Sequence, residues 1–255
     1  MADIVRSAKR RGISLLALTD HDTTDGWEEF RVTCGRYSVR PLSGVELSAK
    51  YHCTVHILGY RFTDFAKLNE ALRWIRSRRA ARNEELLSRL HGLGLSVTME
   101  DVTKHARAVV ARPHFAKALV ALGHARDYQE AFTKYLARGA PAYVPRDGLS
   151  PAECVKVIKS AGGLPVIAHP SLTELDGGEL AELIKSLKTH GLWGLECLSS
   201  HCAPEKTLEY LAMAAEFSLF PTAGSDFHGS VRPAVSLGMQ VTDDFLPWAR
   251  LNTNF

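Results

Sequence analysis

Apolar runs alternate with amphipathic segments along much of the chain. Residues 2–11 have helical periodicity and stop at Gly12, whereas residues 13–19 (ISLLALT) are almost continuously apolar, as in a strand buried on both faces. This alternation indicates an α/β fold with mostly parallel strands, arranged as a sheet or barrel. It predicts further helices near 24–34, 150–161, 178–190 and 204–217, and strands near 39–48, 53–60, 164–168, 192–197 and 219–223.

The middle of the chain has no strong strand signal. A long helix begins near residue 65 and is closed by Gly92 and Gly94, and the Gly- and Pro-rich segment 139–151 marks the return to the strand-and-helix pattern. We therefore expect an α/β barrel formed by residues 1–62 and 146–255, with an all-helical insertion at residues 63–145. Shorter helices are predicted inside the insertion near 98–108, 113–122 and 127–137.

Composition narrows the protein class only modestly. A chain of 255 residues with 45% hydrophobic and 23% charged residues suits one α/β barrel or two small domains. Its net charge of +3 is too small to argue for nucleic-acid binding by itself. Five cysteines without a CxxC pair, and no apolar N-terminal leader, favour a reducing cytoplasm. No apolar run approaches the roughly 20 residues of a membrane span, so we expect no membrane association, and no stable protein partner is implied.

Potential metal ligands follow most of the predicted strands. In a parallel α/β barrel the carboxyl ends of the strands meet on one face, so such residues come together despite their distance in sequence. Imidazole nitrogens and carboxylate oxygens are ligands for borderline and hard divalent cations. The pattern predicts a multinuclear metal site formed by His21, Glu46, His56, His169, Asp226 and His228.

Each candidate ligand also has a simple structural interpretation. His21, flanked by two aspartates, could belong to a helix N-cap cluster. Glu46 could lie in an edge strand, His56 could be a core histidine bonded to a backbone carbonyl, and Asp226 could stabilise a turn. Because these residues follow nearly every strand signal, the set as a whole favours a metal site.

Two residues are candidates for binding phosphate. Arg112 precedes Pro113 at a predicted helix start, where a guanidinium and the helix N-terminus both attract anions, although a surface arginine is the alternative. His201 follows a predicted strand and could contact phosphate or transfer a proton. An arginine stripe on the long helix is either a solvated face or a basic wall that guides a nucleotide: Arg73, Arg76, Arg79 and Arg82.

The motifs TDHDT, GVELS, HILGY, VIAHP, GLE and GSDFHG, in this order, resemble those of the PHP family, named for its polymerase and histidinol-phosphatase members. The resemblance covers nearly the whole chain. RPHFAKALV (112–120) and YLARGAPAYVP (135–145) are most similar to the stand-alone phosphoesterase branch, which includes nucleoside 3′,5′-bisphosphate phosphatases and 5′-to-3′ exoribonucleases acting on short RNA.

The resemblance implies a distorted (β/α)7 barrel with up to three divalent ions, usually manganese or iron, with zinc as a further possibility. His21 and His228 would hold one ion, and Glu46 would bridge the other two. His56 and His169 would bind one of the bridged ions, and Asp226 would bind the other. Glu196, in the GLE motif, matches a family position without an assigned role.

One family feature is missing from this pattern. The family opens with a strand that ends in HxH and is followed by an aspartate, ahead of the helix that corresponds here to MADIVRSAKRRG. We therefore expect a barrel that lacks its first strand, two histidines and one aspartate. A mis-set start or a truncated copy is the favoured explanation, because the other ligand positions are intact.

The expected activity is metal-dependent hydrolysis of phosphate esters of nucleotides, such as 3′,5′-bisphosphates, or of short RNA. Metal-activated water would be the nucleophile, with no catalytic side chain besides the metal ligands. One alternative is a truncated, catalytically impaired barrel that retains only nucleotide or partner binding. Another is an amidohydrolase, which is disfavoured because no lysine ends a barrel strand as that class requires for its metal bridge.

Overall fold

The computed structural model describes residues 1–255 except 107–108, 146, 230–231, 243–244 and 252–255. The chain divides into a sheet unit, Met1–Ala71 with Leu149–Phe255, and a helical unit, Leu72–Gly148. The domain boundaries expected from the sequence stay predictions. Residue 146 and the end of the expected helix 98–108 lie outside the described residues.

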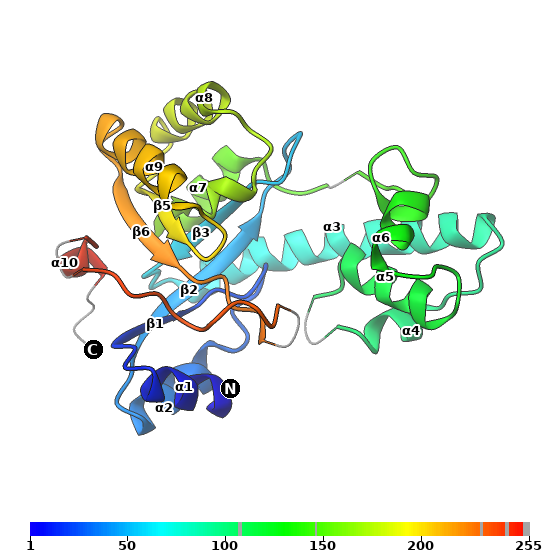
Figure 1. Ribbon diagram of the computed structural model, residues 1–255, viewed down its shortest axis with the longest axis horizontal. Helices are drawn as coiled ribbons and strands as arrows, with labels where there is room; N and C mark the ends of the chain where they lie inside the picture. The colour runs from blue at the N-terminus through cyan, green and yellow to red at the C-terminus, as the bar shows by residue number, and fades with distance from the viewer. Residues whose placement is uncertain (107–108, 146, 230–231, 243–244, 252–255) are drawn as a thin grey trace. The chain divides into compact units, whose positions relative to one another are not determined.

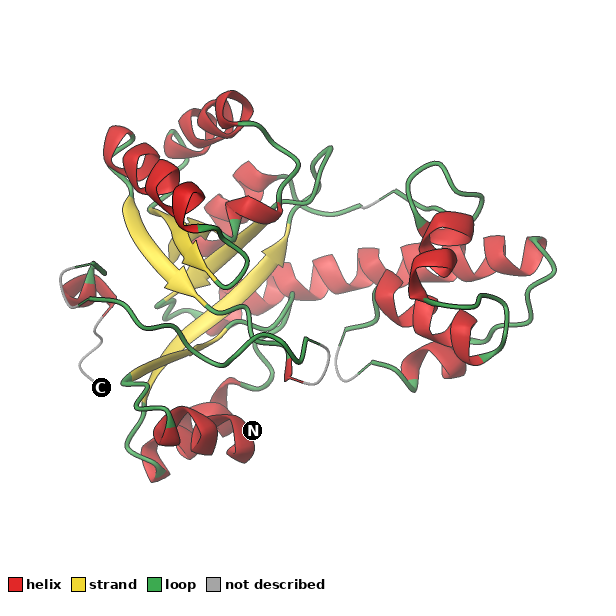
Figure 2. Cartoon of the chain, viewed as in Figure 1, coloured by secondary structure: helices red, strands yellow, loops and turns green. Residues whose placement is uncertain are grey.

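Six strands form one curled half-barrel in the described part of the sheet unit (Figures 1 and 2). Each strand pairs with the next one along the chain, in the order β1-β2-β3-β4-β5-β6. The predicted α/β class is therefore confirmed. The strands are β1 (Leu15–Leu18), β2 (Arg40–Ser48), β3 (His56–Tyr60), β4 (Leu164–Ile167), β5 (Gly194–Ser199) and β6 (Phe220–Gly224).

Strand β3 runs antiparallel to both of its neighbours, whereas the β1–β2, β4–β5 and β5–β6 pairs are parallel. The short connection between Ser48 and His56 explains the reversal, because a parallel pair needs a crossover of a dozen residues or more. As a result, the first residue of β3 meets the last residues of β2. Ser48 pairs with His56, and the N–H of Ala168 donates to the carbonyl of His56 at 3.1 Å.

Amphipathic helices cover the sheet and follow the predicted pattern. α2 packs on β2, α7 packs on β3 and β4, and α9 packs on β5 and β6. Ser150 and Glu153 form a capping box that begins α7, and Asp176 and Glu179 form one at the start of α8. The helices of the sheet unit include α1 (Ala2–Arg10), α2 (Trp27–Arg36), α7 (Pro151–Ser160), α8 (Gly177–Lys188), α9 (Pro204–Glu216), α10 (Trp248–Leu251) and the 3-10 turn η2 (Pro170–Leu172).

An apolar cluster joins the central strands, and Leu251 of α10 is buried in it. Leu58 and Val166 belong to this cluster. Glu46 stands opposite Leu58 in the strand register, so its side chain emerges on the same face of the sheet as that of Leu58. The fold therefore places a carboxylate beside an apolar core, where an unpartnered charge is costly.

The helical unit has its own core, centred on the fully buried Phe115, Leu119 and Leu136. The long helix α3 (Phe65–Gly92) ends at the predicted Gly92. Among the described helices, none is both long and apolar enough to cross a bilayer. The other helices in the described part of this unit are α4 (Met99–Thr103), α5 (Arg112–Ala121), α6 (Tyr128–Ala131) and the π-helical turn η1 (Phe132–Leu136).

Candidate metal centre

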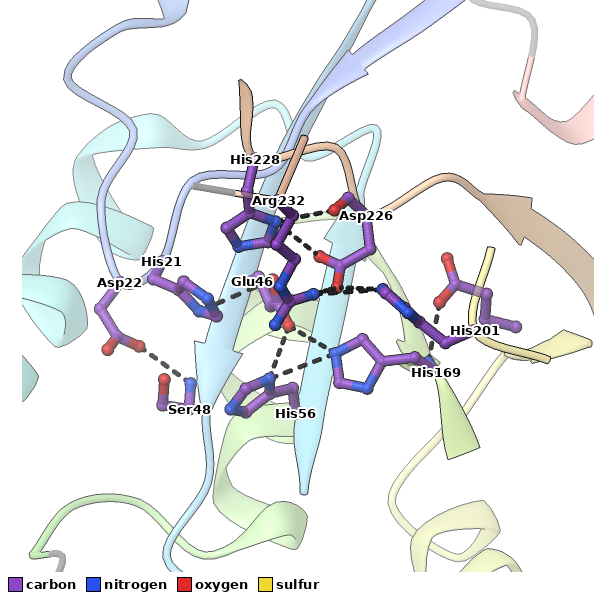
Figure 3. Close-up of polar contacts among 11 residues, drawn as sticks. His21, Asp22, Glu46, Ser48, His56, His169, His201, Asp226, His228 and Arg232 are labelled. Atoms are coloured by element: carbon purple, nitrogen blue, oxygen red, sulfur yellow. Dashed lines mark hydrogen bonds and ion pairs between the residues drawn. The ribbon is translucent and has the colours of Figure 1, made fainter. Parts of the chain in front are cut away.

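The six predicted ligands come from five strands or strand ends and lie at one end of the sheet (Figure 3). His21 follows β1 and forms an isolated parallel bridge with Glu46 of β2. His56 begins β3, and its reversed direction brings it to this end. His169 follows β4, and the remaining two ligands, Asp226 and His228, follow β6.

Glu46 is the centre of the arrangement and is only 4% exposed. Its Oε1 lies 2.6 Å from His56 Nδ1 and 2.9 Å from His169 Nε2, and its Oε2 lies 3.6 Å from His21 Nδ1. The ligand atoms of His21, Glu46 and His56 all lie within 4.8 Å of one another. The sheet therefore brings three imidazoles around one buried carboxylate.

The electrostatics of this group match a cation site. His56 Nδ1 and His169 Nε2 lie 3.3 Å apart, each close to the same oxygen of Glu46. A ring nitrogen that carries the imidazole proton can donate to this oxygen, whereas two unprotonated nitrogens would direct their lone pairs at it together, an arrangement that a metal ion stabilises. His169 Nδ1 is buried and has no hydrogen-bond partner in the described part of the chain. The mixed nitrogen and oxygen donor set fits a divalent metal ion.

The pKa shifts of Glu46 and His169 are consistent with a charged carboxylate surrounded by imidazoles. Burial favours the neutral form of Glu46, but the charges of His21 and His56 and the hydrogen bonds from the histidines hold its pKa well below the usual value. Burial lowers the pKa of His169, but the hydrogen bond to Glu46 together with the negative charges of Glu46, Glu196 and Asp226 outweighs it, and the net shift is upward. The group is therefore arranged around a negative carboxylate.

Asp226 and His228 form a second part of the site. His228 Nδ1 lies 2.7 Å from the backbone oxygen of Asp226 and 3.3 Å from its Oδ1. The ring centroid of His228 is 6.1 Å from that of His21, which links the two parts. Nearby, burial raises the pKa of Asp20, against the lowering effect of His228.

Three residues of this region adopt positive φ angles, which non-glycine residues rarely do: Asp22 at 54°, His169 at 24° and Asp226 at 52°. Asp22 is held by a hydrogen bond from the backbone N–H of Ser48 to its Oδ1, at 2.9 Å. Such conformations cost about 1–3 kcal/mol each and persist where the surroundings impose them. The strand ends are thus bent to aim side chains into the site.

Glu196, which the sequence singled out without a role, supports His169. Its Oε2 accepts a hydrogen bond from the His169 backbone N–H at 2.7 Å. Burial raises its pKa to about 8, with this hydrogen bond opposing the shift. Sequence reasoning could not find this role, because the partner is a backbone group 27 residues away.

Arg232 is the residue that sequence reasoning missed. Its Nη1 donates to Asp226 Oδ2 and lies 3.2 Å from His201 Nε2 (Figure 3). His201 Nε2 is itself 3.3 Å from Asp226 Oδ2. A single arginine in a loop without periodicity carries no sequence signal. The structure thus brings the predicted phosphate-binding residue His201 next to the predicted ligand Asp226.

The other predicted phosphate-binding residue, Arg112, lies in the helical unit as the first residue of α5. Its Nη1 donates to the Leu136 carbonyl at 3.4 Å, and its guanidinium lies over the Tyr143 ring, 5.4 Å from the centroid. The arginine stripe of α3 is not uniformly solvated, because Arg82 is only 8% exposed. The role of Arg112 remains a prediction.

Comparison with known proteins identifies the family of the chain. The model of the PHP domain matches residues 1–142. The 3′,5′-nucleoside bisphosphate phosphatase of Chromobacterium violaceum is 31% identical over 252 residues, covering 97% of this chain and 88% of that protein. A 5′-3′ exoribonuclease of Haemophilus influenzae is 29% identical over 228 residues, covering 89% of this chain and 83% of that protein.

Two solved structures are similar over nearly the whole chain. A Chromobacterium violaceum protein described as an amidohydrolase, with bound sulfate and no metal, has a TM-score of 0.86 at 30% identity and covers 98% of this chain and 89% of its own. A Bifidobacterium adolescentis protein assigned as a metal-dependent phosphoesterase has a TM-score of 0.80 at 29% identity and covers 95% and 87%. Because the family model matches more than half of the chain and the relatives are named as phosphoester hydrolases, this chain belongs to the PHP-domain family and is a hydrolase.

Proposed function

We propose that this protein hydrolyses phosphate esters of nucleotides, with 3′,5′-bisphosphates or short RNA as substrates, by means of metal-activated water. The buried Glu46, with three imidazoles around its two oxygens, is the observation that carries the proposal. Binding a substrate through hydrogen bonds alone would not require three imidazoles around a buried carboxylate. The phosphatase and exoribonuclease names of the relatives support the nucleotide class.

We propose that the ligands are divided between the two parts of the site. Glu46 would bridge two ions, with His56 and His169 on one of them and Asp226 on the other, while His21 and His228 would hold a third; the short distances from Glu46 to His56 and His169 support this division. Divalent ions held here would lower the pKa of a bound water and neutralise charge on the phosphoryl oxygens. Manganese is the proposed metal, although iron or zinc would accept the same donors. The full ligand set is His21, Glu46, His56, His169, Asp226 and His228.

Residues of the chain itself would bind and orient the substrate. His201 would contact a phosphoryl group of the substrate, a role supported by its position beside the carboxylate of Asp226. Arg112 is proposed as a second cationic contact, because its planar guanidinium matches phosphate. Asp22 would keep the loop of His21 in place through the hydrogen bond that its carboxylate accepts from the Ser48 backbone N–H.

We also propose that the fold is of the family's seven-stranded barrel type. A family member with all of its ligands would bind up to three divalent ions. We further place the protein in a reducing cytoplasm, which is supported by the free state of all five cysteines. The competing candidate is an impaired barrel that binds nucleotides without hydrolysing them, and it predicts no turnover.

The test is phosphate release from adenosine 3′,5′-bisphosphate and from a short 5′-phosphorylated RNA by protein loaded with manganese. We expect turnover that disappears with a chelator and returns with the metal. The Glu46→Gln variant should lose at least 100-fold in kcat/KM, whereas Glu205→Gln, at an exposed glutamate of α9, should keep wild-type activity. Tight nucleotide binding without turnover in metal-loaded wild-type protein would support the impaired barrel instead.

A further inference from the structure

Arg232 is fixed to the candidate site by one end of its guanidinium. Its Nη1 donates to Asp226 Oδ2 and also lies 3.2 Å from His201 Nε2. The side chain of Asp226 is 11% exposed, while that of Arg232 is 40% exposed. The arginine is therefore held by a largely buried carboxylate but still reaches solvent.

The anchored nitrogen leaves the other edge of the guanidinium available. A guanidinium carries five N–H donors in one plane, and two adjacent nitrogens make a fork that matches two phosphate oxygens. Within the described residues, Nη1 is the only nitrogen of Arg232 with a hydrogen-bond partner. The edge formed by Nε and Nη2 is thus available for bidentate binding.

This arginine lines a pocket with a volume of about 650 Å³, which is within the range of small-molecule sites. The described lining offers positive charge and hydroxyl donors and includes no aspartate or glutamate. It also includes none of the six proposed metal ligands. The lining residues are Ser200, His201, Arg232, Pro233, Ala234, Val235 and Ser236.

Asp226 separates this pocket from the candidate metal centre. Its Oδ1 is 3.3 Å from His228, whereas its Oδ2 contacts Arg232 and His201. One carboxylate oxygen thus faces the candidate metal centre, and the other contacts residues of the pocket. An anion bound by Arg232 would lie next to the metals but on the other side of Asp226.

We propose that Arg232, together with His201, binds a second phosphate of the substrate, the one that is not cleaved. This inference rests on the proposed function and names the feature of the substrate that the site selects. The ligand chemistry is a phosphoryl group on a nucleotide whose other phosphate reacts at the metal centre. This phosphoryl group belongs either to a mononucleotide bisphosphate or to the next phosphodiester of a short RNA.

The kinetic test compares substrates with one and two phosphates. With manganese-loaded protein, Arg232→Gln should lower kcat/KM for adenosine 3′,5′-bisphosphate about 10- to 100-fold more than for adenosine 3′- or 5′-monophosphate, mainly through KM. Arg232→Lys should recover part of the loss, because it keeps the charge without the fork. Arg36→Gln, at an exposed arginine of α2, should leave all substrates unchanged.

A further substrate, a 5′-phosphorylated dinucleotide, identifies which kind of phosphate the pocket binds. If the larger loss occurs with a 5′-phosphorylated dinucleotide and not with the bisphosphate, the pocket binds the RNA backbone; if it occurs with the bisphosphate, it binds a terminal phosphate. Equal losses for all substrates would overturn the proposal. The proposal would also be overturned if elemental analysis showed that Arg232→Gln binds less manganese and this deficit explained the whole loss of kcat/KM. Arg232 would then only support Asp226.

Equilibrium binding separates this inference from the proposed function. Calorimetric titration of chelator-treated protein with adenosine 3′,5′-bisphosphate should show about 10-fold or greater weakening in Arg232→Gln relative to both wild type and Arg36→Gln. If wild-type protein releases no phosphate under any metal, the proposed function fails, yet this binding difference would still support the pocket. If turnover is normal and the binding difference is absent, the pocket fails and the proposed function stands.

Discussion

The carboxylate of Glu196 accepts a hydrogen bond from the backbone N–H of His169 at 2.7 Å, and His169 has a φ of 24° at that point. Positive φ angles are uncommon for residues other than glycine and persist where the surroundings impose them. The ring of the same residue places Nε2 2.9 Å from Glu46. The GLE motif of β5 therefore acts on the neighbouring loop, where it fixes a candidate ligand through its backbone.

Replacing Glu196 should consequently affect metal binding more than substrate binding. We expect Glu196→Ala to weaken manganese affinity about 10- to 100-fold, the usual effect of losing a residue that orients a ligand. Glu196→Gln keeps an oxygen that can accept the His169 N–H and should recover most of the affinity. Calorimetric titration with manganese measures both variants. Equal affinity in Glu196→Ala and wild type would show that His169 does not need this hydrogen bond.

Gly224 makes room for the same carboxylate. A Cβ added at residue 224 would overlap Glu196 Oε1, so the carboxylate would have to move. Gly224→Ala should therefore displace Glu196 and cost about 1–3 kcal/mol in the free energy of unfolding. Denaturant unfolding measures the loss. Gly35→Ala, where a Cβ meets no atom within 4 Å, is the matched control and should not destabilise the protein.

The double variant tests whether the two residues act together. If Gly224→Ala acts by pushing Glu196, adding Glu196→Ala should remove much of the clash, so the two effects on unfolding should not add. Strict additivity would mean that the glycine is needed for another reason.

The Cys34 thiol should make stability depend on pH under alkaline conditions. Burial raises its pKa from 9.0 to about 11, so the folded state keeps the proton that the unfolded state loses. Between these two values the folded protein binds more protons, and the free energy of unfolding falls as pH rises, by about 1 kcal/mol per pH unit at most. Cys34→Ser removes the titrating group. The stability difference between wild type and this variant should be constant below pH 8 and should shrink above pH 9.

Local patterns in the sequence predicted much of the fold for identifiable reasons. The buried apolar run before His21 and the one before His169 indicate strands, and strand ends in an α/β fold meet on one face. The direction of β3 was not predicted, because it depends on the length of a loop and not on periodicity. This matters for His56, which lies at the start of its strand and still reaches Glu46.

Contacts between distant loops could not be predicted. Arg232 contacts Asp226 and His201 only because β5 and β6 are neighbours and their following loops converge. Glu196 was noticed through its motif, but its role depends on a backbone N–H whose position only the folded chain defines. For Arg112 the sequence placed the helix start within one residue, while its function remains open to experiment.

Glu46 should determine metal affinity more strongly than any single histidine, because both of its oxygens face imidazoles. Glu46→Gln removes the negative charge but keeps the size of the side chain. We expect manganese affinity to fall at least 100-fold in this variant and about 10-fold in His21→Gln, whose ring nitrogen is 3.6 Å from the carboxylate and whose side chain is 38% exposed. Elemental analysis after dialysis against defined manganese concentrations gives both values, with Glu205→Gln as the control. If the order is reversed, with His21→Gln losing more than Glu46→Gln, the ion lies outside the histidine group around Glu46.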